Sequence, residues 1–212
     1  MGREFIDLFE EWADSYDASV AGEDPQYAAV FHDYDKILDE VVTNISGNVL
    51  EFGVGTGNLT KKVLDNGNHV IGVEPSAAMR TIAADKMPDV SIMEGDFITF
   101  PNPGKEINTI ISSYAFHHLT DDEKSEAIEN FAELLSEKGK IVFADTMFES
   151  TTAKEDIIKE AYTNGYVDLI EDLNREYYPT ISTLNNIFDR NNFHVSFSKM
   201  NDFVWLVIAE KK

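Results

Sequence analysis

The stretch Val49-Leu50-Glu51-Phe52-Gly53-Val54-Gly55-Thr56-Gly57-Asn58-Leu59 decides the fold of this chain. A short apolar run with one acid leads into glycines at every second position, and a helical pattern follows. The spacing predicts a buried strand, a tight turn and a helix start, because glycine tolerates positive φ and leaves backbone bare. N–H groups at a helix start favour an anionic group. The stretch therefore predicts a nucleotide-type cofactor site on an α/β sheet, with a ligand-free turn as the alternative.

Composition narrows the possible functions. The 212 residues, 43% of them hydrophobic, suit a single domain over 1–212. The chain has no cysteine, which excludes disulfides and thiolate chemistry. A net charge of −22 argues against nucleic acid or anionic lipid as a partner. No apolar run approaches the roughly 20 residues of a membrane span, and acids stand where a signal peptide would be apolar. We expect a cytoplasmic monomer or homodimer that acts on a small molecule.

Two helices are predicted before the glycine turn. Apolar residues recur at helical spacing from Phe5 to Tyr16 and again over 27–45, before Gly47. Trp12 is expected in the core. Tyr16 stands beside an acidic stretch and is a candidate for a lid over a ligand, with core packing as the alternative. Residues 1–46 form the predicted N-terminal helical cap.

Strands and helices then alternate. Strands are predicted over 48–52, 69–74, 90–94, 107–113 and 140–144. Ser76 is the expected N-cap of one intervening helix, and Thr120 with Glu123 the capping box of another. The helical connections imply right-handed crossovers and a parallel sheet. Residues 47–146 would then form the cofactor-binding core.

The C-terminal part, 147–212, has a different pattern. Helices are predicted over 157–178, with a break near Gly165, and over 179–190. Strands are predicted over 193–197 and 203–209. The segment that contains residues 199–202 connects the two strands and is too short for a crossover, so they should form an antiparallel hairpin. The fold class is therefore α/β, with five parallel strands and an antiparallel hairpin in one sheet.

Acids follow two of the predicted strands. In open α/β sheets, ligands bind beyond the carboxyl ends of the strands. Glu74 lies 21 residues after Gly53, a spacing at which a carboxylate can accept from both hydroxyls of a ribose. Asp96 follows the next strand and could accept from an exocyclic amine such as that of adenine. Helix capping or a solvated loop is the alternative for both acids.

These motifs resemble those of the class I S-adenosylmethionine-dependent methyltransferases. The segments that match the first three family motifs are Glu51-Phe52-Gly53-Val54-Gly55-Thr56-Gly57, Val73-Glu74-Pro75-Ser76 and Glu94-Gly95-Asp96-Phe97. Residues 112–119 resemble the segment after the fourth strand. The resemblance covers the whole chain and is closest to the YrrT-like group of small bacterial methyltransferases, including residues 201–205. It implies a Rossmann-like three-layer sandwich with a seven-stranded sheet, its last strand antiparallel, and S-adenosyl-L-methionine as cofactor.

The resemblance also implies the cofactor-binding residues. Glu51 would meet the methionine ammonium, Glu74 the ribose hydroxyls and Asp96 the adenine amine. Met79 and Phe97 would pack beside the adenine ring. The implied set is Glu51, Gly53, Gly55, Gly57, Glu74, Met79, Asp96 and Phe97, to which the lid candidate Tyr16 is added.

The implied reaction is an in-line displacement of the methyl group. His117 follows the fourth strand and could accept a proton from the acceptor at neutral pH. The alternative is that, of His117 and His118, one caps the next helix and the other packs below the cofactor. No set of His, Asp and Glu has metal-ligand spacing, so no metal is expected.

Two other classes of function stay open. An NAD-type oxidoreductase would want a glycine at the position of Asn58. A non-catalytic module would bind the cofactor without transferring its methyl group.

Overall fold

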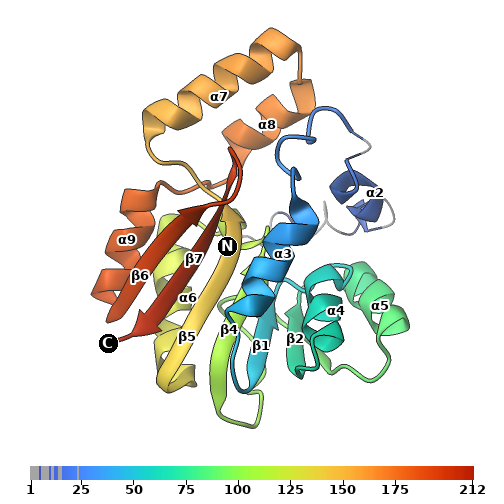
Figure 1. Cartoon of the computed structure of the whole chain (residues 1–212), viewed down its shortest axis with the longest axis vertical. Helices are drawn as coiled ribbons and strands as arrows, with labels where there is room; N and C mark the ends of the chain where they lie inside the picture. The colour runs from blue at the N-terminus through green and yellow to red at the C-terminus, as the bar shows by residue number, and fades with distance from the viewer. Residues whose placement is uncertain (1–4, 6–9, 11, 14–15, 23) are drawn as a thin grey trace.

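Seven strands form one sheet in the order β3-β2-β1-β4-β5-β7-β6. The computed structural model describes residues 5, 10, 12–13, 16–22 and 24–212 (Figure 1). Strands β1 to β5 run parallel, and β7 is antiparallel to both β5 and β6. The predicted fold class is therefore confirmed, including the hairpin. The strands are β1 (Val49–Phe52), β2 (Val70–Glu74), β3 (Ile92–Glu94), β4 (Ile107–Ser113), β5 (Leu135–Thr146), β6 (Phe193–Lys199) and β7 (Val204–Lys211).

Helices cover both faces of the sheet. Their bounds are α2 (Tyr16–Val20), α3 (Tyr34–Thr43), α4 (Asn58–Asp65), α5 (Ala77–Lys86), α6 (Asp121–Leu134), α7 (Thr151–Asn164), α8 (Val167–Arg175) and α9 (Ile181–Arg190), with a short 3-10 helix η2 at Phe116–His118. On one face, α6 and α9 bury Phe131 and Phe188 against the sheet. On the other face, α3 and α4 contribute Ile37, Val41 and Val63 to a second core. The molecule therefore has three layers, with the sheet between two layers of helices and one core on each face of the sheet.

The predicted helix starts are largely those observed. Ser76 Oγ accepts from Met79 N at the start of α5, and Thr120 and Glu123 form the capping box of α6. Gly165 adopts φ 72° at the end of α7, which separates α7 from α8. These local signals are strong because each one satisfies N–H or C=O groups that a helix end leaves unpaired.

The N-terminal region differs from its prediction. The helix expected over 27–45 begins only at Tyr34, after Asp33 in a left-handed conformation. The amide of Asn201 donates to the carbonyls of Val30 and His32 (3.1 and 2.9 Å), so tertiary contacts replace the early helical turns. The helix expected from residue 5 to residue 16 falls largely outside the described residues. Trp12 was expected in the core, but it is 37% exposed and lines a cavity.

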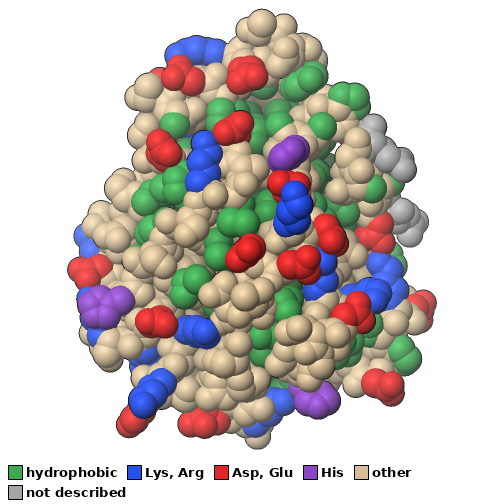
Figure 2. Space-filling view, in the orientation of Figure 1, with side chains coloured by type: hydrophobic (Ala, Val, Ile, Leu, Met, Phe, Trp, Pro, Cys, Tyr) green, Lys and Arg blue, Asp and Glu red, His purple; other side chains and the backbone are tan. Residues whose placement is uncertain are grey.

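Several helices lie at the edge of the sheet where the carboxyl ends of the parallel strands meet. Helices α2, α7 and α8 all lie at this edge, beyond the ends of the parallel strands (Figure 1). Acidic and basic side chains are interspersed on the face shown in Figure 2, so the net charge is not gathered there into one patch. Within the described part of the chain, no helix has both the length and the apolar character to cross a membrane.

Candidate functional site

The glycine turn connects β1 to α4. Gly53, Gly55 and Gly57 have φ values of 68°, 57° and 91°, which L side chains rarely adopt. At Gly53 the close approach is also steric, because a Cβ there would lie 2.7 Å from the Cβ of Ala115 in the loop after β4. The turn therefore needs glycine both for its backbone conformation and for its contact with the neighbouring loop.

Glu51 is the next-to-last residue of β1 and is buried. Glu51 is only 1% exposed, and its Oε2 accepts a hydrogen bond from Thr60 Oγ1 at 2.7 Å. The other oxygen, Oε1, is buried and has no hydrogen-bond partner among the described residues. Loss of hydration raises the pKa of Glu51 to about 8. The arrangement leaves an unsatisfied buried acceptor beside the glycine turn, which is a costly state unless a ligand pairs with it.

Glu74 ends the adjacent strand β2. Its Oε2 accepts from Gly55 N at 2.8 Å and its Oε1 from Ser76 N at 2.9 Å. Burial raises the pKa of Glu74 to about 7, although both N–H bonds favour the charged form. The carboxylate thus joins the glycine turn to the start of α5.

The remaining predicted cofactor residues lie around these acids. Met79, on the first turn of α5, is buried, and its sulfur would lie 3.8 Å from a Cβ at Gly55. Phe97 is buried and stacks on Phe52 with a centroid distance of 5.4 Å. Asp96 Oδ1 accepts from the N–H groups of residues 98 and 99, so this carboxylate also stabilises its own loop. The structure thus brings the predicted residues to the ends of β1, β2 and β3.

The N-terminal segment lies over the glycine turn. Tyr16 begins α2, and its hydroxyl is hydrogen-bonded to that of Tyr34. Asp17 accepts from Thr56 Oγ1 at 2.6 Å and pairs with Lys86 Nζ at 2.6 Å. Glu10 accepts from Ala77 N at 2.6 Å at the start of α5. Acidic side chains therefore fix this segment to the turn and to α5.

His117 lies between two buried carboxylates. Its Nδ1 is 2.5 Å from Asp145 Oδ1, and its Nε2 is 3.3 Å from Glu176 Oε2. The ring of Tyr178 stacks on the imidazole at 4.8 Å. Burial opposes a charge on His117, but the two carboxylates overcome it and raise its pKa to about 9. The two carboxylates therefore favour the protonated form of His117. The N-cap of α6 is Thr120 and not a histidine.

His118 and Lys124 complete this region. Burial and the neighbouring His117 lower the pKa of His118 to about 3, so its ring is neutral. Lys124 is fully buried, and its ammonium donates to the carbonyls of Leu119 and Tyr177. Lys124 thus joins the loop that carries the histidines to the segment that follows α8.

A cavity of about 410 Å³ opens beyond the ends of β4 and β5. Its walls include both histidines and residues from α8, together with Tyr27, Phe31, Tyr114, Glu176, Tyr178 and Phe203. Tyr114 has φ 52°, and its buried hydroxyl has no hydrogen-bond partner among the described residues. A strained residue with an unpaired hydroxyl at a strand end is typical of a ligand-binding position.

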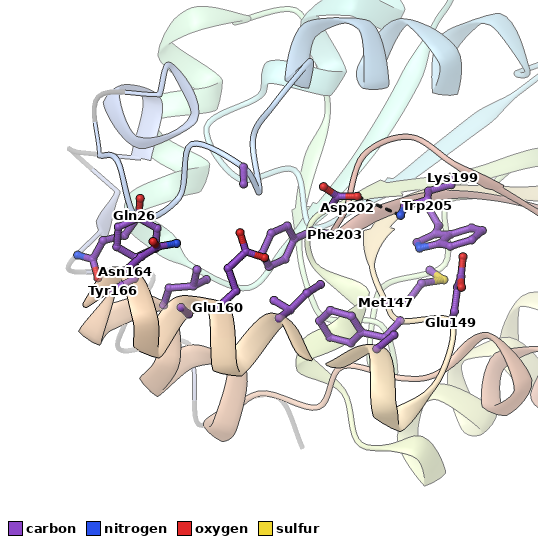
Figure 3. A pocket seen from close by; sticks show the side chains of 16 residues that line it. Gln26, Met147, Glu149, Glu160, Asn164, Tyr166, Lys199, Asp202, Phe203 and Trp205 are labelled. Atoms are coloured by element: carbon purple, nitrogen blue, oxygen red, sulfur yellow. Dashed lines mark ion pairs between the residues drawn. The ribbon is translucent and has the colours of Figure 1, made fainter. Parts of the chain in front are cut away.

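A second cavity of about 380 Å³ lies beneath α7. Figure 3 shows Glu160 of α7 on one side and Trp205 and Lys199 of the β6–β7 hairpin on the other. It shares Leu169 and Phe203 with the first cavity, but its walls contain neither histidine and neither Glu176 nor Tyr114. We therefore place the chemistry in the first cavity.

Sequence reasoning missed several residues of the site. Asp145 lies near the end of β5, where the rule on acids at strand ends could have found it. Glu176 follows α8, and no local pattern relates it to the histidines. Tyr178 was a candidate for the acceptor pocket, with core packing as the alternative, and it lines the first cavity. Asp17 was noted only as part of an acidic stretch. The missed residues belong to elements that are distant in sequence from the motifs that they contact.

Comparisons with known proteins agree with this geometry. Residues 49–139 match a family model described as a methyltransferase domain. A protein from Oceanobacillus iheyensis, described as an uncharacterized methyltransferase, is 58% identical over 100% of this chain and 99% of its own length. The chain belongs to the class I S-adenosylmethionine-dependent methyltransferases. A second methyltransferase, from Bacillus licheniformis, is 55% identical to it over the full length of both chains.

Solved structures show the same fold. A magnesium protoporphyrin IX methyltransferase from Synechocystis with bound SAH has a TM-score of 0.68 at 17% identity, covering 97% of this methyltransferase and 99% of that chain. A Thermotoga maritima protein described as a possible histamine N-methyltransferase has a TM-score of 0.69 at 17% identity, covering 97% and 98%. The predicted enzyme class is thus confirmed at the level of the family.

Proposed function

We propose that this methyltransferase binds S-adenosyl-L-methionine across the ends of β1, β2 and β3 and transfers its methyl group to a small molecule in the cavity beyond β4 and β5. The observation that carries the proposal is Glu51 Oε1, a buried carboxylate oxygen without a partner beside the glycine turn. An ammonium group such as that of the cofactor's methionine part would pair with it and offset its desolvation.

Glu74 is the proposed ribose acceptor. Each of its oxygens accepts one backbone N–H, and a carboxylate oxygen has a second lone pair for a hydroxyl. Gly53, Gly55 and Gly57 let the cofactor approach the backbone. Met79, Asp96 and Phe97 would surround the adenine, and Tyr16 would close over the cofactor from α2.

The transfer itself needs alignment more than proton chemistry. An acceptor lone pair attacks the methyl carbon, the neutral thioether leaves, and the positive charge disperses, so the site must hold the atoms in line and exclude water. A base is needed only for an acceptor that carries a proton on the attacking atom. His117 is our candidate for that base, and Asp145 and Glu176 oppose the loss of its proton. Its use as a base therefore requires that the Nε2 proton leave first.

A calorimetric titration with S-adenosylhomocysteine tests the cofactor site. Glu74→Gln replaces one of the two accepting oxygens by an NH2 donor and leaves one ribose hydroxyl without its acceptor, a loss of about 1–3 kcal/mol or roughly 5- to 150-fold in Kd. The matched control is Glu94→Gln, an exposed acid at the end of β3 that pairs with Arg80. The control should bind within about twofold of wild type. Equal affinity of Glu74→Gln and wild type would contradict the assignment.

Two further measurements separate the other classes of function. Heat stabilisation by S-adenosylhomocysteine but not by NADH would exclude the oxidoreductase. Incubation with methyl-labelled cofactor and a cell metabolite pool should release S-adenosylhomocysteine and a labelled small molecule. Binding without any release would indicate a non-catalytic module. The YrrT-like grouping, the cytoplasmic location and the absence of a nucleic-acid partner stay proposals that rest on the sequence.

A further inference from the structure

Three potential metal ligands meet at the wall of the acceptor cavity. His117 and His118 come from η2 after β4, and Glu176 follows the last turn of α8. Glu176 lies 3.3 Å from His117 Nε2 and 3.9 Å from His118 Nδ1, and all three ligand atoms lie within 4.8 Å of one another. Their side chains are only 8%, 12% and 5% exposed.

A fourth residue orients one of these ligands. Asp145 binds His117 Nδ1, and it also accepts from the backbone N–H groups of Phe116 and His117 at 2.6 and 3.1 Å. The carboxylate is therefore fixed, and it turns Nε2 of the imidazole toward Glu176. Histidines that bind metals commonly direct their other ring nitrogen to a carboxylate in this way. A chance ion pair does not need this second, backbone-anchored carboxylate.

We propose that His117 Nε2, His118 Nδ1 and the Glu176 carboxylate form a binding site for a divalent cation of the zinc class. Two imidazoles and one carboxylate are a donor set that suits Zn²⁺ and leaves a fourth position open. Tetrahedral bonds of about 2.0–2.1 Å place ligand atoms roughly 3.3 Å apart. Glu176 Oε2 and His117 Nε2 already have this separation. Oε1 of the same carboxylate lies 3.9 Å from His118 Nδ1, and the three ligand atoms, now within 4.8 Å of one another, must draw closer around the ion.

The site faces the cavity that we assign to the acceptor. All three ligands line that cavity, so the open position is accessible to water or to an oxygen, nitrogen or sulfur atom of a bound small molecule. The cation would take the place of the proton between His117 and Glu176, so His117 Nε2 could act as the base only in the metal-free protein. Spacing along the chain could not predict this site, because Glu176 comes from an element far from the histidines in sequence. The inference does not depend on cofactor binding at the glycine turn.

The test is a titration of chelator-treated protein with ZnCl₂ by calorimetry, repeated with CoCl₂ by visible absorption. We expect one Zn²⁺ per chain and the intense absorption bands of tetrahedral Co²⁺. His118→Asn and Glu176→Gln each remove one ligand with little change in size and should weaken Zn²⁺ binding at least tenfold. Asp145→Asn leaves the three ligands in place and should weaken it by about 10- to 100-fold.

His194→Ala is the matched control, because His194 is exposed on β6 and lies outside the cluster. It should bind Zn²⁺ as wild type does. Affinity for S-adenosylhomocysteine, measured on the same samples, shows that each variant is folded and separates this test from that of the methyl-transfer site. If wild type takes up no more Zn²⁺ than the Glu176→Gln variant, the cluster is a proton-held ion pair and the proposal is wrong.

Discussion

At the scale of single residues, the site depends on two carboxylates buried at the ends of adjacent strands. Glu51 and Glu74 have pKa values raised to about 8 and about 7, chiefly because burial removes their hydration. The charge of Glu74 also raises the pKa of Glu51. Such a pair lowers the free energy of unfolding, and perturbed carboxylates of this kind cluster at functional sites, where a ligand can stabilise them.

Glu51 makes the stability of the ligand-free protein depend on pH. Its pKa is higher in the folded than in the unfolded chain, so the folded state holds the extra proton between about pH 4.5 and pH 8. The free energy of unfolding should therefore fall as pH rises through this window, by up to about 1.4 kcal/mol per pH unit. Urea denaturation of wild type and Glu51→Gln at several pH values measures the difference.

The variant isolates Glu51 from the other groups that titrate in the same window. The difference between wild type and Glu51→Gln should shrink steadily from pH 8 to pH 5. Glu129→Gln, at an exposed position on α6, should follow wild type at every pH. A difference that does not change with pH would show that Glu51 is hydrated in solution.

Single residues were also where the sequence was most informative. Gly53, Glu51 and Glu74 could be found because their spacing and their places at strand ends reflect local backbone rules. The roles of the site residues stay predictions until the titrations are done. Tyr114 was a candidate for the acceptor pocket, but its left-handed backbone and unpaired hydroxyl could not be predicted, because they depend on packing against α3 and the neighbouring loop.

At the scale of elements, α2 is attached to the cofactor turn mainly through Asp17. Its carboxylate accepts from Thr56 and Asn58 and pairs with Lys86, and the carboxylate side chain is 49% exposed. Exposed ion pairs contribute little to global stability. Such contacts can still determine how long a short helix stays over a bound ligand.

Asp17→Asn should therefore loosen α2 without unfolding the protein. We expect S-adenosylhomocysteine to dissociate roughly 2–5-fold faster, which corresponds to a loss of up to about 1 kcal/mol, with an unchanged denaturation midpoint. Stopped-flow displacement measures the rate. Asp65→Asn is the control, because Asp65 makes an exposed ion pair of the same 2.6 Å length with Lys61. Identical dissociation rates in wild type and Asp17→Asn would exclude a lid role for α2.

Element boundaries were predictable where caps fix them and not where tertiary contacts do. Ser76, Thr120 and Gly165 mark helix ends that agree with the structure. Apolar periodicity over 27–33 predicted helix, but the side chains of that segment pack instead against Tyr114 and α8. Periodicity reports which residues are buried, and here burial was achieved without helical geometry.

At the scale of the whole molecule, the order of the strands was predictable and the assembly of the acceptor side was not. Five strands with helical crossovers and a terminal hairpin restrict the topology to very few arrangements. The acceptor cavity depends on where α8 and its following segment lie against η2. That placement follows from buried contacts such as those of Lys124, which no local pattern records.

The net charge of −22 predicts a salt-dependent stability. Repulsion among 39 acids and 17 bases opposes the compact state, and salt screens it. The melting temperature should rise between about 0.01 M and 1 M NaCl, over which the screening length falls from about 30 Å to about 3 Å. Near the sequence pI of about 4.4 the rise should disappear. Equal salt effects at both pH values would contradict this explanation.

The buried ammonium of Lys124 has a consequence for how an acceptor enters. It joins the loop of the two histidines to the chain beyond α8, so this wall can separate only by breaking two charge-assisted hydrogen bonds at once. The opposite wall is formed partly by Tyr16 and Trp12, beside α2, which is attached to the glycine turn mainly through the 49% exposed carboxylate of Asp17. The acceptor should therefore enter its cavity beneath the N-terminal segment, so that the cofactor and the acceptor would use the same opening.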